Sequence, residues 1–311
     1  MTAPYASRSI VSIDDLRDED IEAIFSRAQE FADANKRGDK KQPKLAGRTL
    51  FNLYFENSTR TRSSFELAGK RLGMDVINVS AAASSVSKGE TLIDTVASLY
   101  AMSGDVLVLR HPESGSAQLV QDFAKPIVLN AGDGSHQHPS QALLDTFTIL
   151  QKKPKIDGLK IVICGDIRHS RVARSNMQLL TRLGASVTLV APPPLMVREF
   201  AGLPNITLSY DIREAIEDAD VVMMLRIQRE RKAGSAIASV RDYSLRYGLN
   251  HKKLERAKPD VLVMHPGPIN RGVELETPLA DDVERSIILK QVEYGVAVRE
   301  AMLEYACGYL L

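Results

Sequence analysis

The residues with the clearest chemical potential form one short polar run, which follows an apolar, strand-like stretch and opens a helical pattern. At the N-terminus of a helix several backbone N–H groups lack partners inside the helix, and the helix dipole places positive potential there, so a phosphate group is favoured. One guanidinium fork and three hydroxyl groups add donors for phosphate or carbonyl oxygens. An ordinary Ser/Thr cap with surface arginines is the alternative interpretation. The run consists of Ser58, Thr59, Arg60 and Thr61.

Two further donor groups follow other strand-like stretches. Arg110 ends an apolar run, and His138 and Gln141 stand where a helical pattern begins after a glycine-containing loop. A single His before Pro is more often structural, so His138 gains a chemical interpretation only from the motifs around it.

In the second half of the chain, arginines follow two more strand-like runs. The segment 164–175, which contains Arg171, leads from a strand into a helix, where a dinucleotide site has to be considered. The G-x-G-x-x-G glycines are missing, and bulky residues stand where the backbone would approach a pyrophosphate, so that interpretation is rejected. Arg226 and Gln228 begin a polar stretch, and a planar guanidinium suits a carboxylate. A charged surface loop is the alternative interpretation for this stretch.

The composition excludes several classes of protein. Lys and Arg number 40 against 39 for Asp and Glu, so no global field attracts nucleic acid or an anionic membrane. Cys164 and Cys307 cannot form a disulfide framework or a four-ligand zinc site. The sequence begins without a secretory signal, and no apolar run approaches the ~20 residues that cross a bilayer. We therefore expect a cytoplasmic protein without a metal or other cofactor and without nucleic-acid or membrane partners.

The elements that carry these residues alternate between strand and helix. Apolar runs at 49–55, 76–79, 106–109 and 127–129 in the first half, and at 160–164, 187–190, 221–225 and 261–264 in the second, predict the strands. This alternation predicts an α/β protein with two similar domains, each with a mainly parallel sheet flanked by helices. A helix from Pro139 links the domains, and the C-terminal helix packs back on the first. The expected boundaries are 1–139 plus 288–311 and 140–287.

Together these motifs resemble the aspartate and ornithine carbamoyltransferases. The resemblance rests on motifs that stand in the family's order from Phe55 to Glu274, and the match to the family covers nearly the whole chain. The motifs include Phe55 to Glu66 with its Ser-Thr-Arg-Thr-Arg core, Arg110-His111-Pro112, His138 to Asp145, Met264 to Glu274, and the segments 84–91, 164–175 and 225–231.

The resemblance implies a carbamoyl phosphate site. In it, Arg60, Thr61 and His138 are the catalytic residues that contact the carbonyl oxygen, and Gln141 contacts the carbamoyl amide. Gly267 departs from the leucine of some relatives, but it contributes a main-chain contact that survives this change. The expected contacts to carbamoyl phosphate are Ser58, Thr59, Arg60, Thr61, Arg110, His138, Gln141, Gly267 and Pro268.

The same resemblance implies an amino-acid acceptor and shared active sites. Lys88, Arg171, Arg226 and Gln228 are the expected acceptor contacts. Ser84 and Lys88 are expected to come from the neighbouring subunit of a homotrimer, although a serine at 87 replaces the second lysine of some relatives. Regulatory chains or a dihydroorotase-type protein are further partners known in the family, and nothing in this sequence decides between them.

Aspartate is the expected acceptor, in an early step of pyrimidine biosynthesis. Ornithine enzymes of the family carry an H-C-L-P turn and an S-M-G segment, whereas this chain has His265-Pro266-Gly267-Pro268 and no S-M-G. The amine would attack the carbonyl carbon directly, and phosphate would leave. Transfer to another amino acid such as ornithine is one alternative. A non-catalytic scaffold is the other, although converging charged donors have no evident use in a scaffold.

Overall fold

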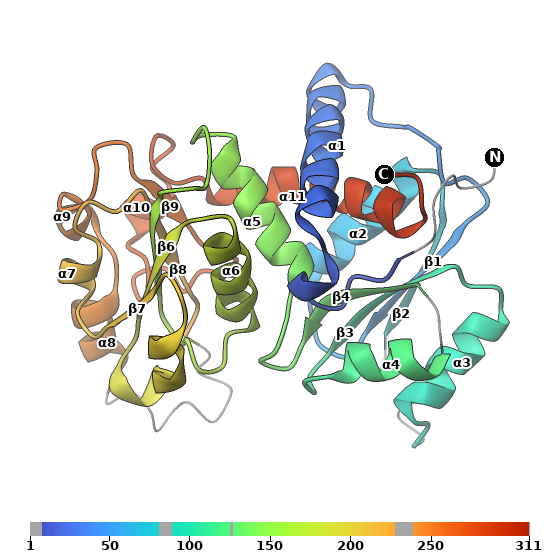
Figure 1. Cartoon of the computed structure of the whole chain (residues 1–311), viewed down its shortest axis with the longest axis horizontal. Coiled ribbons are helices and arrows are strands. Elements are labelled where there is room, and N and C mark those ends of the chain that lie inside the picture. The colour runs from blue at the N-terminus through green and yellow to red at the C-terminus, as the bar shows by residue number, and fades with distance from the viewer. Residues whose placement is uncertain (1–7, 81–88, 125–126, 228–238, 311) are drawn as a thin grey trace. The chain divides into compact units, whose positions relative to one another are not determined.

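The computed structural model describes residues 8–80, 89–124, 127–227 and 239–310. The chain divides into two compact units, one made of Met1–Leu144 with Val292–Leu311 and the other of Asp145–Gln291. Both are α/β units with one parallel sheet each, as predicted (Figure 1). The division falls inside helix α5 (Pro139–Leu150) and inside helix α11 (Ile288–Ala306), so each of these helices has residues in both units.

The sheet of the first unit has four strands in the order β2-β1-β3-β4, all parallel. The chain runs outward from β1 to β2 and then returns to β3 on the opposite side of β1. Ligands of open α/β sheets bind at such a switch point, outside the carboxyl ends of the strands. The strands are β1 (Thr49–Tyr54), β2 (Asp75–Ser80), β3 (Val106–His111) and β4 (Ile127–Asp133).

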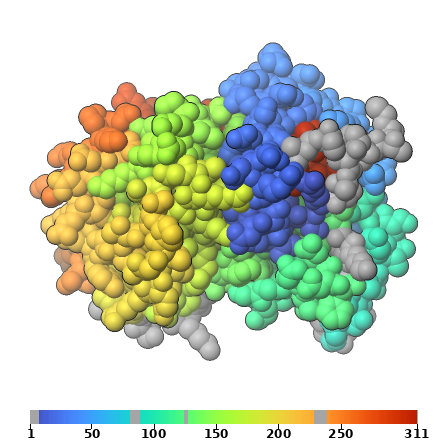
Figure 2. All heavy atoms as spheres, in the orientation of Figure 1, coloured from blue at the N-terminus to red at the C-terminus, as the bar shows by residue number. Residues whose placement is uncertain are grey.

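Helices cover both faces of this sheet. Figure 1 shows α3 and α4 on one face, with α1 and α2 on the other. The strands β1 and β3 are almost continuously buried, as expected for a parallel sheet that is covered on both sides. Figure 2 shows helix α1 along the surface of this unit, where its charged residues meet solvent. The helices are α1 (Asp18–Arg37), α2 (Thr59–Arg71), α3 (Leu92–Ala101) and α4 (Ser116–Ala124).

The sheet of the second unit has five parallel strands in the order β7-β6-β5-β8-β9, with the switch point between β5 and β8. Its strands are β5 (Lys160–Cys164), β6 (Ser186–Val190), β7 (Ile206–Ser209), β8 (Val221–Met224) and β9 (Leu262–Met264). Its helices are α6 (Arg171–Arg182), α7 (Ile212–Ala215), α8 (Val240–Tyr247), α9 (His251–Leu254) and α10 (Thr277–Ala280). Short 3-10 helices lie at Ile13–Asp15, Pro193–Leu195 and Arg198–Gly202.

The α/β class and the eight predicted strands are confirmed. The ninth strand, β7, was missed because it is an edge strand of four residues that are not fully buried. Among the described residues, no helix is long and apolar enough to cross a membrane.

Both cysteines are buried. Cys164 ends β5 with no exposed surface, and Cys307 follows α11 with 1% exposed. Burial away from water disfavours the thiolate and raises the pKa of each thiol to about 12. Neither side chain is poised for nucleophilic or redox chemistry.

Two buried carboxyl groups fasten α11 within the first unit. Glu304 accepts hydrogen bonds from Arg27 Nε at 2.7 Å and Nη2 at 2.9 Å. Glu300, one helical turn earlier, lies 3.6 Å from Arg71 Nη1 and accepts a bond from Asn35 Nδ2 at 3.4 Å. The expectation that the C-terminal helix packs on the N-terminal part of the chain is therefore confirmed.

Glu300 makes the stability of the protein depend on pH. Burial raises the pKa of its carboxyl to about 7, against the attraction of Arg71. A raised pKa stabilises the fold at acid pH, and this contribution is lost as pH rises through about 7. The unfolding free energy of the wild type should therefore fall with rising pH, by an amount on the order of 3 kcal/mol. In Glu300→Gln, which has no carboxyl group to titrate at this position, we expect this fall to be absent.

Urea unfolding at pH 5 and pH 8 measures this difference. The exposed Glu293 of the same helix provides the control, because Glu293→Gln should retain the pH dependence of the wild type. Equal pH dependence in wild type and Glu300→Gln would contradict the prediction.

Candidate active site

The predicted anion-binding run begins helix α2 at the carboxyl end of β1. Ser58 has extended backbone at the N-cap, and its carbonyl accepts the N–H of Arg62 at 3.2 Å. Within the described residues, the Ser58 hydroxyl caps no N–H group of the first turn. Thr59 and Arg60 are exposed, whereas Thr61 is buried. The start of this helix therefore presents backbone and side-chain donors together, as the sequence predicted.

Arg110 lies beside this run because β3 is the neighbour of β1. The register places Arg110 opposite Tyr54, and the Arg110 carbonyl accepts the N–H of Phe55 at 2.9 Å. Its guanidinium Nη1 donates to the carbonyl of Ala131 at 3.2 Å, and Nε lies 3.3 Å from Glu56 Oε2. The side chain is thus fixed between the loop after β1 and the end of β4, with a carboxylate that offsets part of its charge.

His138 reaches the same edge through the end of β4. The register sets Asp133, the last residue of β4, opposite His111 of β3. His138 directly precedes α5, is 3% exposed, and has its Nδ1 3.4 Å from the hydroxyl of Ser140. Gln141, in the first turn of α5, is also buried and donates its backbone N–H to the His138 carbonyl at 3.0 Å.

Sequence reasoning missed the buried side chains that hold this loop. The Asp133 carboxylate accepts bonds from Asn130 Nδ2 at 2.9 Å, from the Gly115 N–H at 2.7 Å and from the Gln137 N–H at 3.0 Å. It fixes the backbone immediately before His138. A strand-end Asp next to two glycines was the only available signal, and such residues are common in ordinary turns.

In the second unit, the predicted acceptor residues also gather at carboxyl ends of strands. Arg171 is the first residue of α6, which follows β5, and its side chain is 7% exposed. Arg226 follows β8 and is half-buried. The two strands are joined where the Leu225 N–H donates to the Cys164 carbonyl at 2.8 Å. These arginines therefore flank the switch point of the second sheet.

Gly165 permits this close approach of β5 and β8. It has a φ of 147°, and a Cβ there would lie 2.7 Å from Cβ and 2.9 Å from the carbonyl oxygen of Leu225. Any other residue would push the two strand ends apart. Gly165 thus has a packing function at the ends of these two strands.

The turn after β9 completes this edge of the second sheet. Gly267 and Pro268 follow the strand, and the peptide bond between them is cis. Because β8 pairs with β9, the turn begins beside the strand end that carries Arg226. Arg171, Arg226 and this turn therefore belong to one edge.

Three predicted residues lie outside the described parts of the chain. They are Ser84, Lys88 and Gln228. In residues 8–80, 89–124, 127–227 and 239–310, no group of three or more His, Cys, Asp or Glu side chains could hold a metal ion.

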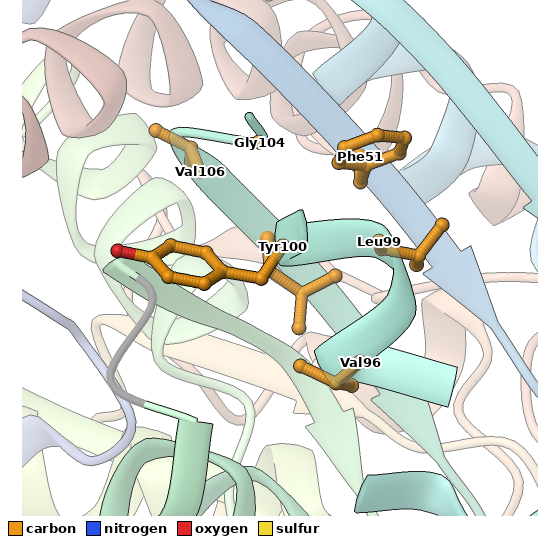
Figure 3. A pocket seen from close by; sticks show the side chains of 7 residues that line it. Phe51, Val96, Leu99, Tyr100, Gly104 and Val106 are labelled. Atoms are coloured by element: carbon orange, nitrogen blue, oxygen red, sulfur yellow. The ribbon is translucent and has the colours of Figure 1, made fainter. Parts of the chain in front are cut away.

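A small apolar hollow lies elsewhere in the first unit, where α3 ends and β3 begins. Figure 3 shows its lining, in which the Tyr100 hydroxyl is the one polar group among the labelled side chains. Its lining residues are Phe51, Val96, Leu99, Tyr100, Gly104, Val106 and Leu107. Because it touches the amino end of β3, it is separate from the carboxyl edge that carries the predicted site.

Two family models match almost the entire chain. The carbamoyl-P binding domain of aspartate/ornithine carbamoyltransferase matches residues 8–151, and the Asp/Orn binding domain matches residues 157–306. The chain therefore belongs to the aspartate/ornithine carbamoyltransferase family. The resemblance inferred from the motifs is confirmed.

One relative and two solved structures show how similar this chain is to individual members of the family. The aspartate carbamoyltransferase catalytic subunit of Rhodospirillum rubrum is 52% identical over 306 residues, which cover 98% of this chain and 96% of the relative. The structure of aspartate transcarbamoylase from Trypanosoma cruzi in complex with carbamoyl phosphate and aspartate matches with a TM-score of 0.87 and 33% identity, over 98% of both chains. Ornithine carbamoyltransferase from Pyrococcus furiosus matches with the same TM-score at 29% identity, again over 98% of both.

Proposed function

We propose that this chain is the catalytic subunit of an aspartate carbamoyltransferase. It transfers the carbamoyl group of carbamoyl phosphate to the amine of L-aspartate, which yields N-carbamoyl-L-aspartate and phosphate in an early step of pyrimidine biosynthesis. The observation that carries the proposal is the gathering of the α2 N-terminus, Arg110 and His138 at one edge of the first sheet. The R. rubrum relative carries this name at 52% identity, which favours aspartate over ornithine.

The first unit binds carbamoyl phosphate in this proposal. Its phosphate lies at the start of α2, where N–H groups, hydroxyls and Arg60 donate, and Arg110 adds a second guanidinium. Arg60, Thr61 and His138 donate toward the carbonyl oxygen, and Gln141 contacts the carbamoyl amide. The fixed position of Arg110 between Glu56 and the Ala131 carbonyl supports this assignment, because donors that are already oriented need little rearrangement when a substrate binds.

The chemistry needs no covalent intermediate on the protein. The unprotonated amine of aspartate attacks the carbonyl carbon, a C–N bond forms, and negative charge grows on the carbonyl oxygen. The intermediate then collapses, the bond from carbon to the phosphate oxygen breaks, and phosphate leaves with the electron pair of that bond. The amine proton leaves with it, since phosphate can accept that proton. Positioning the two reactants supplies much of the acceleration, on the order of 7–11 kcal/mol for well-oriented groups.

The second unit binds the acceptor through its arginines. Arg171 is almost fully buried and Arg226 half-buried, so each guanidinium is partly removed from water and can attract a carboxylate strongly. Gln228 and Lys88 complete the set of acceptor contacts. We assign residues 1–139 and 288–311 to the carbamoyl phosphate domain and 140–287 to the aspartate domain. The two family models, over residues 8–151 and 157–306, support the assignment of the N-terminal and central residues. The division of the chain into units, which groups Val292–Leu311 with Met1–Leu144, supports the assignment of the C-terminal residues.

The chain works as a homotrimer in this proposal, with Ser84 and Lys88 reaching the active site of a neighbouring subunit. The segment that carries them follows β2, the edge strand of the first sheet, on which Ile77 is 45% exposed. An exposed edge strand with apolar side chains suits a subunit interface.

A mixing experiment tests the shared sites. Arg60→Ala and Lys88→Ala should each be inactive alone, because each lacks one contributor to every site. When the two are dissociated, mixed in equal amounts and reassembled, roughly one quarter of the sites in a cyclic trimer should contain both native residues. Activity that stays at the level of the separate variants would place Lys88 in the site of its own chain. Reassembled wild type is the control for losses during dissociation.

The function itself is tested by phosphate release from carbamoyl phosphate with L-aspartate or L-ornithine as acceptor. We expect release that depends on aspartate. Release that depends on ornithine would leave the carbamoyl phosphate site in place and change the acceptor. A folded protein that releases phosphate with neither acceptor would favour the scaffold alternative.

A further inference from the structure

The turn after β9 is held from inside by a buried histidine. The His265 side chain has no exposed surface, and its Nδ1 accepts the N–H of Gly267 at 2.7 Å. Because Nδ1 accepts this bond, the ring proton of neutral His265 resides on Nε2. The Nε2 atom lies 3.3 Å from Glu274 Oε1.

Glu274 holds the other end of the same turn. Its side chain is fully buried, and Oε1 accepts the backbone N–H of Asn270 at 2.6 Å. The histidine and the glutamate therefore fix the backbone on both sides of Pro268, at Gly267 and at Asn270. The side chains of His265 and Glu274 also contact each other. The closed arrangement of His265, Gly267, Asn270 and Glu274 is called the turn clamp.

The turn clamp is connected to the strand end that carries Arg226. The side-chain amide of Asn270 donates to the carbonyl of Ile227 at 3.4 Å. On its other side, the backbone N–H of His265 donates to Gln291 Oε1 at 3.0 Å, and Gln291 Nε2 donates to the buried Asp145 at 2.6 Å. The turn thus has a hydrogen-bonded path to the neighbouring strand end and to helix α5.

We propose that His265 and Glu274 are positioning residues that hold the Gly267 and Pro268 carbonyls at a fixed spacing from Arg226. This inference rests on the proposed function, in which Arg226 binds the acceptor, and on the expectation from the family resemblance that Gly267 and Pro268 contact carbamoyl phosphate. A buried ionic or polar pair contributes little to stability compared with apolar side chains of similar size. The specific effect of the turn clamp is therefore on geometry, and displacement of a reacting group by about 1 Å can lower a rate ~100-fold.

The matched variants are Glu274→Leu and Glu274→Gln. Leucine fills the space but removes the acceptor for the Asn270 N–H, whereas glutamine keeps an acceptor oxygen there. We expect kcat to fall at least ~10-fold in Glu274→Leu and to remain within about 3-fold of wild type in Glu274→Gln, as for other groups that orient site residues. Binding of inorganic phosphate, a probe of the α2 N-terminus, should be unchanged in both.

A second pair separates the two nitrogens of the histidine. The oxygen of asparagine occupies the place of Nδ1 and can still accept the Gly267 N–H, whereas the amide of glutamine reaches the place of Nε2. His265→Asn should therefore retain more activity than His265→Gln. This pair decides the question if Glu274→Leu does not fold. Equal activity in the two histidine variants, or wild-type kcat in folded Glu274→Leu, would overturn the proposal.

Amide hydrogen exchange distinguishes failure of this inference from failure of the proposed function. The Gly267 and Asn270 N–H groups should be protected in the wild type, and Asn270 should lose protection in Glu274→Leu but keep it in Glu274→Gln. This result does not depend on activity. Fast exchange at both groups in the wild type would contradict the turn clamp even in an active enzyme.

Discussion

Replacement of Arg60 by alanine should lower kcat/KM for carbamoyl phosphate by about 10³-fold. Arg60 stands in the first turn of α2, where it is exposed and can reach a bound anion. In the proposed reaction, its guanidinium contacts both the phosphate and the carbonyl oxygen on which charge develops. Loss of one preorganised donor to such an oxygen typically costs a factor of about 10²–10³, and loss of a phosphate contact adds to it. Steady-state kinetics with aspartate at saturation measures the effect.

Two matched variants make this test specific. Arg62 lies on the same helix, is also exposed and carries the same charge, so Arg62→Ala should retain activity within a few-fold of wild type. Arg60→Lys keeps the charge but loses the planar fork, so its activity should lie between those of Arg60→Ala and wild type. An equal loss in Arg60→Ala and Arg62→Ala would mean that general positive potential, rather than the Arg60 fork, is responsible.

Replacement of Arg226 by alanine should raise the KM for aspartate about 100-fold. The expected cause is the loss of paired, charge-assisted hydrogen bonds to a carboxylate, each of which is worth about 1.5–3 kcal/mol when partly buried. Binding of carbamoyl phosphate should change little, because the residues proposed to bind its phosphate lie in the first unit. Titration of the initial rate against aspartate, at saturating carbamoyl phosphate, measures the change.

Arg256 is a suitable control for this variant. It lies in the same unit and is exposed, so Arg256→Ala should leave both KM values close to those of wild type. A loss of carbamoyl phosphate binding in Arg226→Ala, with the KM for aspartate unchanged, would exchange the roles assigned to the two units.

The parts of the fold that could be predicted are those encoded by local pattern. Buried parallel strands read as short apolar runs, so β3 and β8 were evident from residues 106–109 and 221–225. Parallel pairing then brings the carboxyl ends of neighbouring strands together, which in the structure places Arg110 and the run at 58–61 at one edge. The edge strand β7 was not predicted because four residues, none of them fully buried, carry too little pattern.

The supporting residues of the site could not be predicted for a different reason. Asp133 and Glu274 are buried carboxylates that accept backbone N–H groups, and the sequence does not show which N–H groups a carboxylate will meet. Gln291 and Asp145 meet only because the fold brings together residues 146 positions apart. Chemistry-bearing residues stand out by type and order, whereas the side chains that orient them become visible only in three dimensions.

The burial of both native thiols makes this chain a favourable host for site-specific labelling. Alkylating reagents react with thiolates, and thiols with a pKa near 12 have almost none of that form at neutral pH. A cysteine introduced at Val283, which is 93% exposed, would therefore react with a maleimide dye while the native cysteines remain intact. The second unit could then carry a fluorescent label while both native cysteines are retained.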